Sequence, residues 1–253
     1  MTHRKSDDEL VWDRPEPVSP AGRPAADASA IAAAAFSIAD RDGLHAVSVK
    51  RVATKLKLQA VALEAYLTSR DDLLDLMLDR AFGEIELPSV AAGNHWRADL
   101  RAIAHATQAV AVRHPWLRSL AGTRTPSGPN GLRLNESVLQ AVSGLGVDPV
   151  QMMQLANTVL AFVYGFVQLE MGHVQRGRDV TEDAAHQART SRRLLEVAAS
   201  GDYPHLAELF AQSANLSAGS AFDVGLDIVL DGIGARIENA AAANVEPAAA
   251  AHT

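Results

Sequence analysis

The chain has 253 residues, which is enough for one large domain or for a small domain joined to a larger one. Hydrophobic residues make up 48% of it and aromatic residues 5%, and long alternating β-branched runs are absent, so an all-helical protein is favoured. The absence of cysteine excludes disulfides and thiolate metal sites, and the net charge of −7 argues against nonspecific nucleic-acid binding by the whole surface, although a local basic patch remains compatible with it.

The two ends of the chain are predicted to be disordered. Residues 1–26 are charged and rich in proline, and the tail over 240–253 is low in complexity. No apolar run follows the first basic residues, so a secretory signal is not expected. The longest apolar stretches are interrupted short of a membrane span, which leads us to expect a cytoplasmic protein with no membrane partner.

Four helices are predicted over residues 27–86. Serine and aspartate stand where they can accept hydrogen bonds from the backbone N–H groups of a first helical turn, and Gly43 suits the left-handed position after a helix. The predicted helices cover 30–40, 49–56, 59–66 and about 70–86, with Asp27 or Ser29, Ser48 and Ser69 as caps of the first, second and fourth.

A larger helical body is predicted over residues 87–239. Glycine and proline separate its periodic segments, and no segment has the pattern of a strand. The predicted helices cover roughly 94–114, 115–121, 129–144, 149–174, 180–200, 203–213 and 218–239.

The helices over 49–56 and 59–66 are about three residues apart, which is the spacing of a helix–turn–helix. Between Val47 and Arg70 five cations face one acid, Glu64, so the local excess is about four positive charges. Such an excess suits contacts to DNA phosphates, which supply most of the affinity for nucleic acid. By charge alone, a solvated face on an ordinary helical bundle fits equally well.

Residues 27–80 resemble the DNA-binding domain of TetR-type bacterial repressors, through "IAAAAFSIADRDGLHAVSVKRVATKL" and "LTSRDDLLDLM". The body is similar to the tetracycline-repressor branch of that family, because "RHPWLRSLAGTRTPSGPNG" contains its Gly-Thr-Arg at residues 122–124 and "FDVGLDIVLDGIGARI" resembles its closing helix. The resemblance spans most of residues 27–239. It implies an all-α fold with a helix–turn–helix domain and linking helix over 27–86, followed by a ligand-binding and dimerisation domain.

The departures from the family pattern cluster at the second helix of the motif. Lys57 replaces the usual glycine of the turn, and Val61 stands where a proline or similar residue is common. Glu64 and Tyr66 replace a tyrosine and a histidine that contact phosphates in the family, while Arg70 replaces a backbone-contacting lysine. A carboxylate a few ångströms from a phosphate is repelled by roughly 1 kcal/mol or more.

Two interpretations of this head follow. In the first it binds operator DNA through polar and cationic residues, and we predict contacts from Ser48, Lys50, Arg51, Lys55, Lys57, Gln59, Tyr66, Thr68 and Arg70. In the second it is a packing relic that no longer binds an operator.

The resemblance also implies a homodimer. Residues 149–173 and 218–239 are apolar nearly all round, so they must be buried on several faces. In the family, the two corresponding helices pair with their copies in a four-helix seam. An intramolecular core is the alternative.

A ligand pocket between the middle helices is implied as well. Leu120 occupies the place of a histidine that coordinates drug-bound magnesium in tetracycline-responsive relatives, so a bulkier apolar effector is expected instead. The predicted wall residues are Ile103, His105, Thr107, Trp116, Leu120, Thr123, Arg124, Met153, Asn157, Tyr164 and Gln168.

No catalytic, cofactor or metal motif is evident. Glu170 and His173 lie three residues apart on one helix face, but the second such pair that a metal site in a helix bundle needs is missing. The sequence thus predicts a ligand-responsive repressor that binds a palindromic operator as a dimer. The alternative is a TetR-like scaffold that has lost the operator and binds or chemically transforms a small metabolite.

Overall fold

The computed structural model describes residues 9–14, 27–64, 66–90, 95–175, 182–212 and 218–250, and within these ranges every regular element is a helix. The all-helical prediction is confirmed. The chain forms two compact units, residues 1–164 and 165–253, and each is considered by itself.

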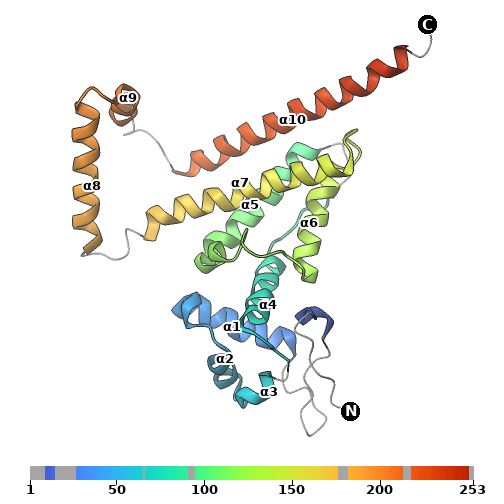
Figure 1. Ribbon diagram of the computed structural model, residues 1–253, viewed down its shortest axis with the longest axis vertical. Helices are drawn as coiled ribbons and strands as arrows, with labels where there is room; N and C mark the ends of the chain where they lie inside the picture. The colour runs from blue at the N-terminus through green and yellow to red at the C-terminus, as the bar shows by residue number, and fades with distance from the viewer. Residues whose placement is uncertain are drawn as a thin grey trace. The chain divides into compact units, whose positions relative to one another are not determined.

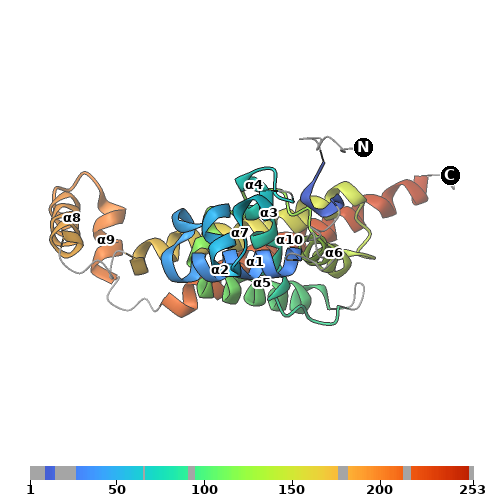
Figure 2. The same ribbon diagram turned by 90° about the horizontal axis from the view of Figure 1, so that it is seen from below.

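The first unit begins with a three-helix head made of α1 (Ala28–Asp42), α2 (Val49–Leu56) and α3 (Ala60–Glu64) (Figure 1). Asp27 Oδ1 accepts a hydrogen bond from Ala30 N–H at 2.6 Å, and Ser48 Oγ accepts one from Arg51 N–H at 3.3 Å, so both predicted caps are present. Viewed from below, α1, α2 and α3 face the reader (Figure 2).

The core of the head consists of aliphatic side chains that recur at helical spacing. Ile31, Val52 and Leu63, one from each helix, are fully buried together with Leu73 and Met77 of the following helix. Burial of such side chains contributes about 1.5–3 kcal/mol each, which holds α3 in place although it has only five residues.

The linking helix α4 (Arg70–Gly83) leaves the head and packs against both α1 and α6 (Figure 1). Ser69 caps its first turn, as predicted, and forms a capping box with Asp72. Nearly every side chain from Asp72 to Phe82 is buried, so the helix is enclosed over most of its length. It ends at Gly83, a few residues before the predicted end at 86.

The rest of the first unit contains α5 (Trp96–Arg113), a 3-10 helix η3 (Pro115–Ser119), α6 (Pro129–Val142) and the first part of α7 (Pro149–Gln175). These elements follow the predicted ranges closely because proline and glycine mark their ends. Leu100, Ile103, Leu134 and Val138 are fully buried where α5 and α6 pack together.

The second unit holds the end of α7, α8 (Glu182–Ala199), α9 (Pro204–Gln212) and α10 (Ala218–Ala250). The rings of Phe166 and Phe222 meet edge to face with centroids 5.2 Å apart. Along α10, Phe222, Leu226, Leu230 and Ile233 are buried at a spacing of three to four residues, which is the stripe of an amphipathic helix.

Three predictions about order and length need correction. Residues 9–14 are not disordered, because a 3-10 helix, η1 (Val11–Asp13), folds against the head and buries Val11; the rest of the predicted arm lies outside the described residues. The predicted tail over 240–253 is helical as far as Ala250, where α10 ends. Pro149–Leu169 of α7 carries no charged residue and is long and apolar enough to cross a membrane by length and composition, contrary to our expectation.

Candidate nucleic-acid interface

The turn between α2 and α3 depends on an unusual backbone conformation at Lys57. This residue has φ 59° and ψ 37°, the left-handed region, and its N–H donates to Thr54 O at 3.1 Å. The next N–H, that of Leu58, donates to Ala53 O at 2.9 Å and closes the end of α2. A side chain in this conformation costs roughly 1–2 kcal/mol relative to glycine, which is the residue the family places here.

A mixed face is exposed on α2, the turn and α3. Lys50, Lys55 and Lys57 supply exposed cations. Gln59, just before α3, and Glu64, the last residue of α3, supply exposed polar groups. Val61 is 74% exposed on α3, which is unusual for a β-branched apolar side chain. Such a face can contact phosphates with its rim and a thymine methyl group with its centre.

Arg51 is less available than the three lysines. Its guanidinium pairs with the Asp42 carboxylate and donates to Ala46 O at 3.4 Å. Hydrogen bonds from Arg41 first, and from Arg51, lower the pKa of Asp42 to about 2 despite some desolvation. The predicted contact from Arg51 therefore competes with an existing ion pair.

Tyr66 was predicted to face DNA, and this is wrong. Its side chain is only 3% exposed, and its hydroxyl donates to Val11 O of the N-terminal segment at 3.1 Å. The backbone after α3 turns inward, because the N–H groups of Tyr66 and Leu67 both donate to Leu63 O at 2.8 Å.

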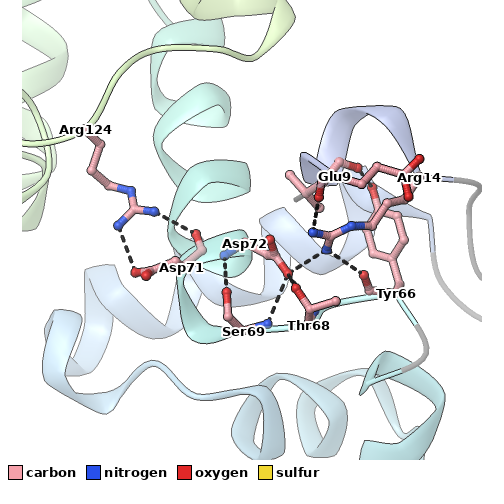
Figure 3. A network of polar contacts seen from close by, with 9 residues as sticks. Glu9, Arg14, Tyr66, Thr68, Ser69, Asp71, Asp72 and Arg124 are labelled. Atoms are coloured by element: carbon pink, nitrogen blue, oxygen red, sulfur yellow. Dashed lines mark hydrogen bonds and ion pairs between the residues drawn. The ribbon is translucent and has the colours of Figure 1, made fainter. Parts of the chain in front are cut away.

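The start of α4 is held by one carboxylate oxygen. Asp72 Oδ2 accepts from Thr68 N–H at 2.6 Å, from the Thr68 hydroxyl at 2.7 Å and from Ser69 N–H at 3.1 Å. Arg14 reaches the same oxygen at 2.7 Å (Figure 3). Burial opposes ionisation of Asp72, but the hydrogen bonds from Arg14, Thr68 and Ser69 outweigh it and lower its pKa.

Arg70 lies beside the hydrogen bonds of Asp72 and is exposed, as its predicted contact with DNA requires. Its guanidinium donates to Leu44 O at 3.2 Å and to Val47 O at 3.5 Å, so it is anchored on the loop before α2. Ser48, which follows that loop, is occupied as the cap of α2. Because arginine has five N–H donors, Arg70 keeps free donors for a phosphate.

Arg124 connects the body to α4 by ion pairs, and we predicted this residue to line the ligand pocket. Its Nε lies 2.6 Å from Asp75 Oδ1, and its Nη1 lies 2.9 Å from Asp71 Oδ1. The hydrogen bond that Arg124 donates to Asp75, together with the one it donates to Asp71, raises the pKa of the guanidinium although burial opposes the charge. Three of its N–H donors are therefore engaged with the linking helix, and its contact with a ligand stays a prediction.

A second set of polar contacts connects the end of α5 to α1 and to the end of α4. His114 is buried, its Nδ1 lies 2.7 Å from Asp40 Oδ1, and its Nε2 lies 3.0 Å from Glu84 Oε2. Only the imidazolium form can donate to both carboxylates. Trp116 Nε1–H donates to Asp40 at 2.7 Å, so Trp116 also belongs to this junction, and its place in the wall of a ligand pocket stays a prediction.

A third set of hydrogen bonds connects α4 to the start of α6. The buried Asp79 carboxylate accepts from Asn130 N–H and Nδ2–H, each at 2.8 Å, and from Gly131 N–H at 2.9 Å. It thus satisfies N–H groups in the first turn of α6. Gly128 is required beside it, because a Cβ there would lie 2.4 Å from Asp79 Oδ1 and 2.6 Å from the Trp12 ring.

The other residues predicted to contact a ligand differ in burial. Thr107 donates to Ile103 O at 2.8 Å and is buried, whereas Met153 and Asn157 are exposed on α7. Burial raises the pKa of the Tyr164 phenol. Ile103 and Leu120 are buried, His105 is half-buried, and Thr123 and Gln168 are exposed. A cleft of about 430 Å³ lies elsewhere, between Trp12, α1, α4 and α6, and none of the predicted wall residues lines it.

No cluster of three or more metal-binding side chains occurs among the described residues. The side chains of Glu170 and His173 lie outside the part of α7 whose side chains the structure describes.

The profile of the tetracyclin repressor-like C-terminal domain matches residues 87–237. An HTH-type transcriptional regulator of Saccharopolyspora erythraea is 35% identical over 200 residues, which are 79% of this chain and 81% of that protein. The HTH-type transcriptional repressor DrrR1 of Streptomyces coeruleorubidus is 32% identical over 230 residues, which are 89% of this chain and 83% of the repressor.

The fold is also similar to that of a solved structure. The TetR family protein ActR of Streptomyces coelicolor, crystallised in complex with actinorhodin, superposes with a TM-score of 0.70 at 26% identity. The match covers 83% of this chain and 96% of ActR.

Proposed function

Because the chain belongs to the TetR family of helix–turn–helix transcriptional regulators, we propose that it is a repressor that binds a palindromic operator as a homodimer and leaves it when a small apolar molecule binds the body. The observation that carries this proposal is the exposed cationic face of α2 and its turn, with Arg70 anchored beside it. Operator DNA is a cytoplasmic partner, so we also expect the protein in that compartment.

Affinity for DNA would come from the cations and sequence preference from α3. Lys50, Lys55 and Lys57 are exposed and can each neutralise a phosphate, with counterions released into solution. Val61 offers methyl groups to a thymine, and Gln59 can make paired hydrogen bonds to an adenine. Glu64 lowers affinity for any duplex unless it accepts a hydrogen bond from a cytosine amino group.

Dimerisation is supported by exposed faces on α7 and α10. On α7 the exposed stripe contains Asn157, Ala161 and Gly165, which are small or neutral and allow close approach of a second helix. On α10, Val224 is 58% exposed and Ile228 is 68% exposed, which is costly for large apolar side chains in water. A second copy of the chain that covers both faces explains them, and it places two heads on successive half-sites.

The effector is proposed to be a small apolar molecule. ActR, to which the chain is similar, is seen bound to actinorhodin. Leu120 offers no ligand atom to a metal and contributes an apolar surface beside the Gly-Thr-Arg segment. We therefore propose binding without magnesium.

Effector binding would reach the head through α4. The loop before α6 holds this helix through Arg124 with Asp71 and Asp75, and the first turn of α6 holds it through Asn130 with Asp79. An effector that displaces the loop changes the position of α4 and thereby the orientation of the head. It can weaken operator binding only by the ratio of its affinities for the two settings, with about 1.4 kcal/mol for each factor of ten.

A second candidate remains, namely a protein that kept the body and lost the operator. It is favoured by the exposed carboxylate on α3 and by the burial of Tyr66, which leave few hydrogen-bond donors on the reading face. Such a protein would sequester or transform a metabolite with polar groups of the body, among them His105 and Tyr164.

Fluorescence anisotropy with duplexes from the region beside the protein's own gene separates the two candidates. The repressor is expected to bind one of these duplexes in low salt, and to lose affinity steeply when the salt concentration is raised fourfold. A purified dimer that binds none of them at low ionic strength would overturn the repressor and leave the metabolite-binding protein.

A further inference from the structure

An N-terminal segment, residues 9–14, folds back against Tyr66, which lies between α3 and α4. Val11 is 2% exposed, and its carbonyl accepts the hydrogen bond from the buried Tyr66 hydroxyl at 3.1 Å. The Arg14 guanidinium donates to Tyr66 O at 3.2 Å and to the carbonyl of Glu9. The segment therefore covers the stretch in which the chain passes from α3 to α4.

Arg14 makes its shortest ion pair with Asp72, at 2.7 Å, and both side chains are buried, with 6% and 11% of their surface exposed. The same Asp72 oxygen holds the N–H groups of Thr68 and Ser69 (Figure 3). Removal of Arg14 leaves a buried carboxylate without its counter-charge, which favours water entry and loosening of the segment that this oxygen organises.

The segment that Asp72 organises precedes Arg70, the predicted phosphate contact at the start of α4. Arg70 can place its guanidinium on Leu44 and Val47 only if the first turn of α4 keeps its position. Arg14 itself is too buried to reach a phosphate. Its influence on DNA must therefore be transmitted through Asp72.

The other side of the segment is fixed to the body. Trp12 Nε1–H donates to Ser127 Oγ at 3.1 Å, and the indole packs against Gly128, where a Cβ would come within 2.6 Å of the ring. Residues 9–14 thus contact both the stretch between α3 and α4 and the loop before α6. Because of this second anchor, the position of Arg14 is set by the body as well as by the head.

We propose that Arg14 is a positioning residue for operator binding: through Asp72 it fixes the segment over 67–70 that presents Arg70 to the DNA backbone. This inference rests on the proposed function, since it assigns a role within DNA binding. It adds to the helix–turn–helix a buried arginine from outside the three-helix head, which the sequence pattern places in a disordered arm.

The test compares Arg14→Ala, Arg14→Lys and the control Asp13→Ala in the full-length protein. Asp13 is exposed on the same 3-10 helix, so its removal tests whether any change in this segment suffices. The probe is a duplex selected from random-sequence DNA by the wild-type protein. Affinity is measured over a range of salt concentrations, and amide hydrogen exchange at Thr68 and Ser69 is measured in the free protein.

Arg14→Ala is expected to weaken binding by about tenfold or more, Arg14→Lys by less, and Asp13→Ala hardly at all. The slope of log affinity against log salt is expected to fall by up to about 0.9 for Arg14→Ala, because the phosphate contact of Arg70 is lost with its position, and to fall no further when Arg14→Ala is combined with Arg70→Ala. Exchange at Thr68 and Ser69 is expected to accelerate in Arg14→Ala and to recover in part in Arg14→Lys.

Each other outcome is decisive. Unchanged exchange at both amides in Arg14→Ala, or faster exchange with unchanged affinity for the duplex, overturns the positioning role. A further fall in the salt slope when Arg14→Ala is added to Arg70→Ala overturns it as well, because Arg14 would then contact DNA itself. If the wild-type protein selects no duplex while the exchange result holds, the repressor function fails and the role of Arg14 in DNA binding fails with it, although its hold on Asp72 stands.

Discussion

Asp71 and Asp72, neighbours in the first turn of α4, form ion pairs on opposite sides with arginines of distant segments. Asp71 accepts from Arg124 at 2.9 Å, and Asp72 accepts from Arg14 at 2.7 Å (Figure 3). Because successive side chains on a helix diverge by about 100°, two adjacent carboxylates can serve two partners. The point where the head ends is therefore also where the body and the N-terminal segment hold it.

The first prediction concerns the ion pair between Arg124 and Asp75. Both side chains are about one fifth exposed, so the pair is worth more than a surface salt bridge and less than a fully buried one. Arg124→Ala, Asp75→Asn and the double variant should show a coupling energy of roughly 1 kcal/mol in urea unfolding at fixed protein concentration.

The matched pair of Arg124 with Asp71 serves as its control. Asp71 is 71% exposed, so the coupling energy in the corresponding cycle is expected to be clearly smaller. Equal coupling in the two cycles would contradict the assignment of Asp75 as the main partner.

The second prediction is a dependence of stability on acid pH that comes from Asp72. Its pKa is lowered in the folded protein from an ordinary value of 3.8. A lowered pKa means that the ionised group stabilises the fold above pH 3.8, and that this stability is lost as the pH falls toward the folded-state value. Unfolding free energies measured below that pH should decline less steeply for Asp72→Asn than for the wild type.

The Arg14→Ala variant provides the counterpart to this measurement. Without the arginine the pKa of Asp72 loses one of the contacts that lower it, so the acid decline should flatten there as well. A decline as steep as that of the wild type in both variants would assign the acid sensitivity to other carboxylates.

The elements that the sequence predicted well are those with local causes. The caps Asp27, Ser48 and Ser69 are each found on the backbone a few residues onward, so short-range pattern was enough to place them. The helices of the body begin and end at prolines and glycines for the same reason.

The contacts that the sequence did not predict join residues far apart in the chain. Arg14 and Asp72 are separated by 58 positions, and Trp12 and Ser127 by 115. Nothing in the composition of a charged, proline-rich segment indicates which distant carboxylate will take its arginine. An isolated Val-Trp pair within that segment was the available sign of an anchored element.

The site residues that were assigned from the family pattern have long-range partners that the pattern did not predict. Tyr66 was assigned from its place in the family pattern, but the chain after α3 turns inward and buries it. Trp116 and Arg124 were assigned to a pocket by resemblance, whereas their polar groups have carboxylate partners on α1 and α4. A pattern of residue types gives the region of a site, and the partner of each polar group requires coordinates.

The third prediction uses the left-handed backbone at Lys57. Lys57→Gly should raise the free energy of unfolding by about 0.5–1 kcal/mol, because glycine adopts this conformation without the Cβ clash. The same change removes an exposed cation from the DNA face, so affinity for the selected duplex should fall, with a salt slope lower by about one.

Lys57→Asn is the companion variant for this measurement. Asparagine tolerates the left-handed region better than lysine but also lacks the charge. It should therefore match the glycine variant in DNA affinity and lie between glycine and lysine in stability. A glycine variant less stable than the wild type would show that the aliphatic part of Lys57 contributes packing.

The fourth prediction concerns the carboxylate on the reading face. Glu64→Gln should strengthen binding to duplexes of any sequence several-fold, since it removes a repulsion of roughly 1 kcal/mol. Glu64→Tyr tests the rival function. If the head has lost its operator, tyrosine should create an affinity that the wild type lacks, whereas tight binding by both proteins would dispose of the rival.

The final prediction assigns a direct phosphate contact to Arg70. Arg70→Ala should weaken binding to all duplexes by a similar factor and lower the salt slope by about one. Arg70→Lys keeps the charge but cannot donate to Leu44 O and Val47 O while contacting a phosphate, so it should weaken binding with the slope retained. Arg133→Ala, which removes the same charge from an exposed position on α6, should change neither quantity measurably. An unchanged slope in Arg70→Ala would mean that the guanidinium acts only on the segment between α1 and α2. An equal reduction of the slope in Arg133→Ala would mean that net charge alone governs binding.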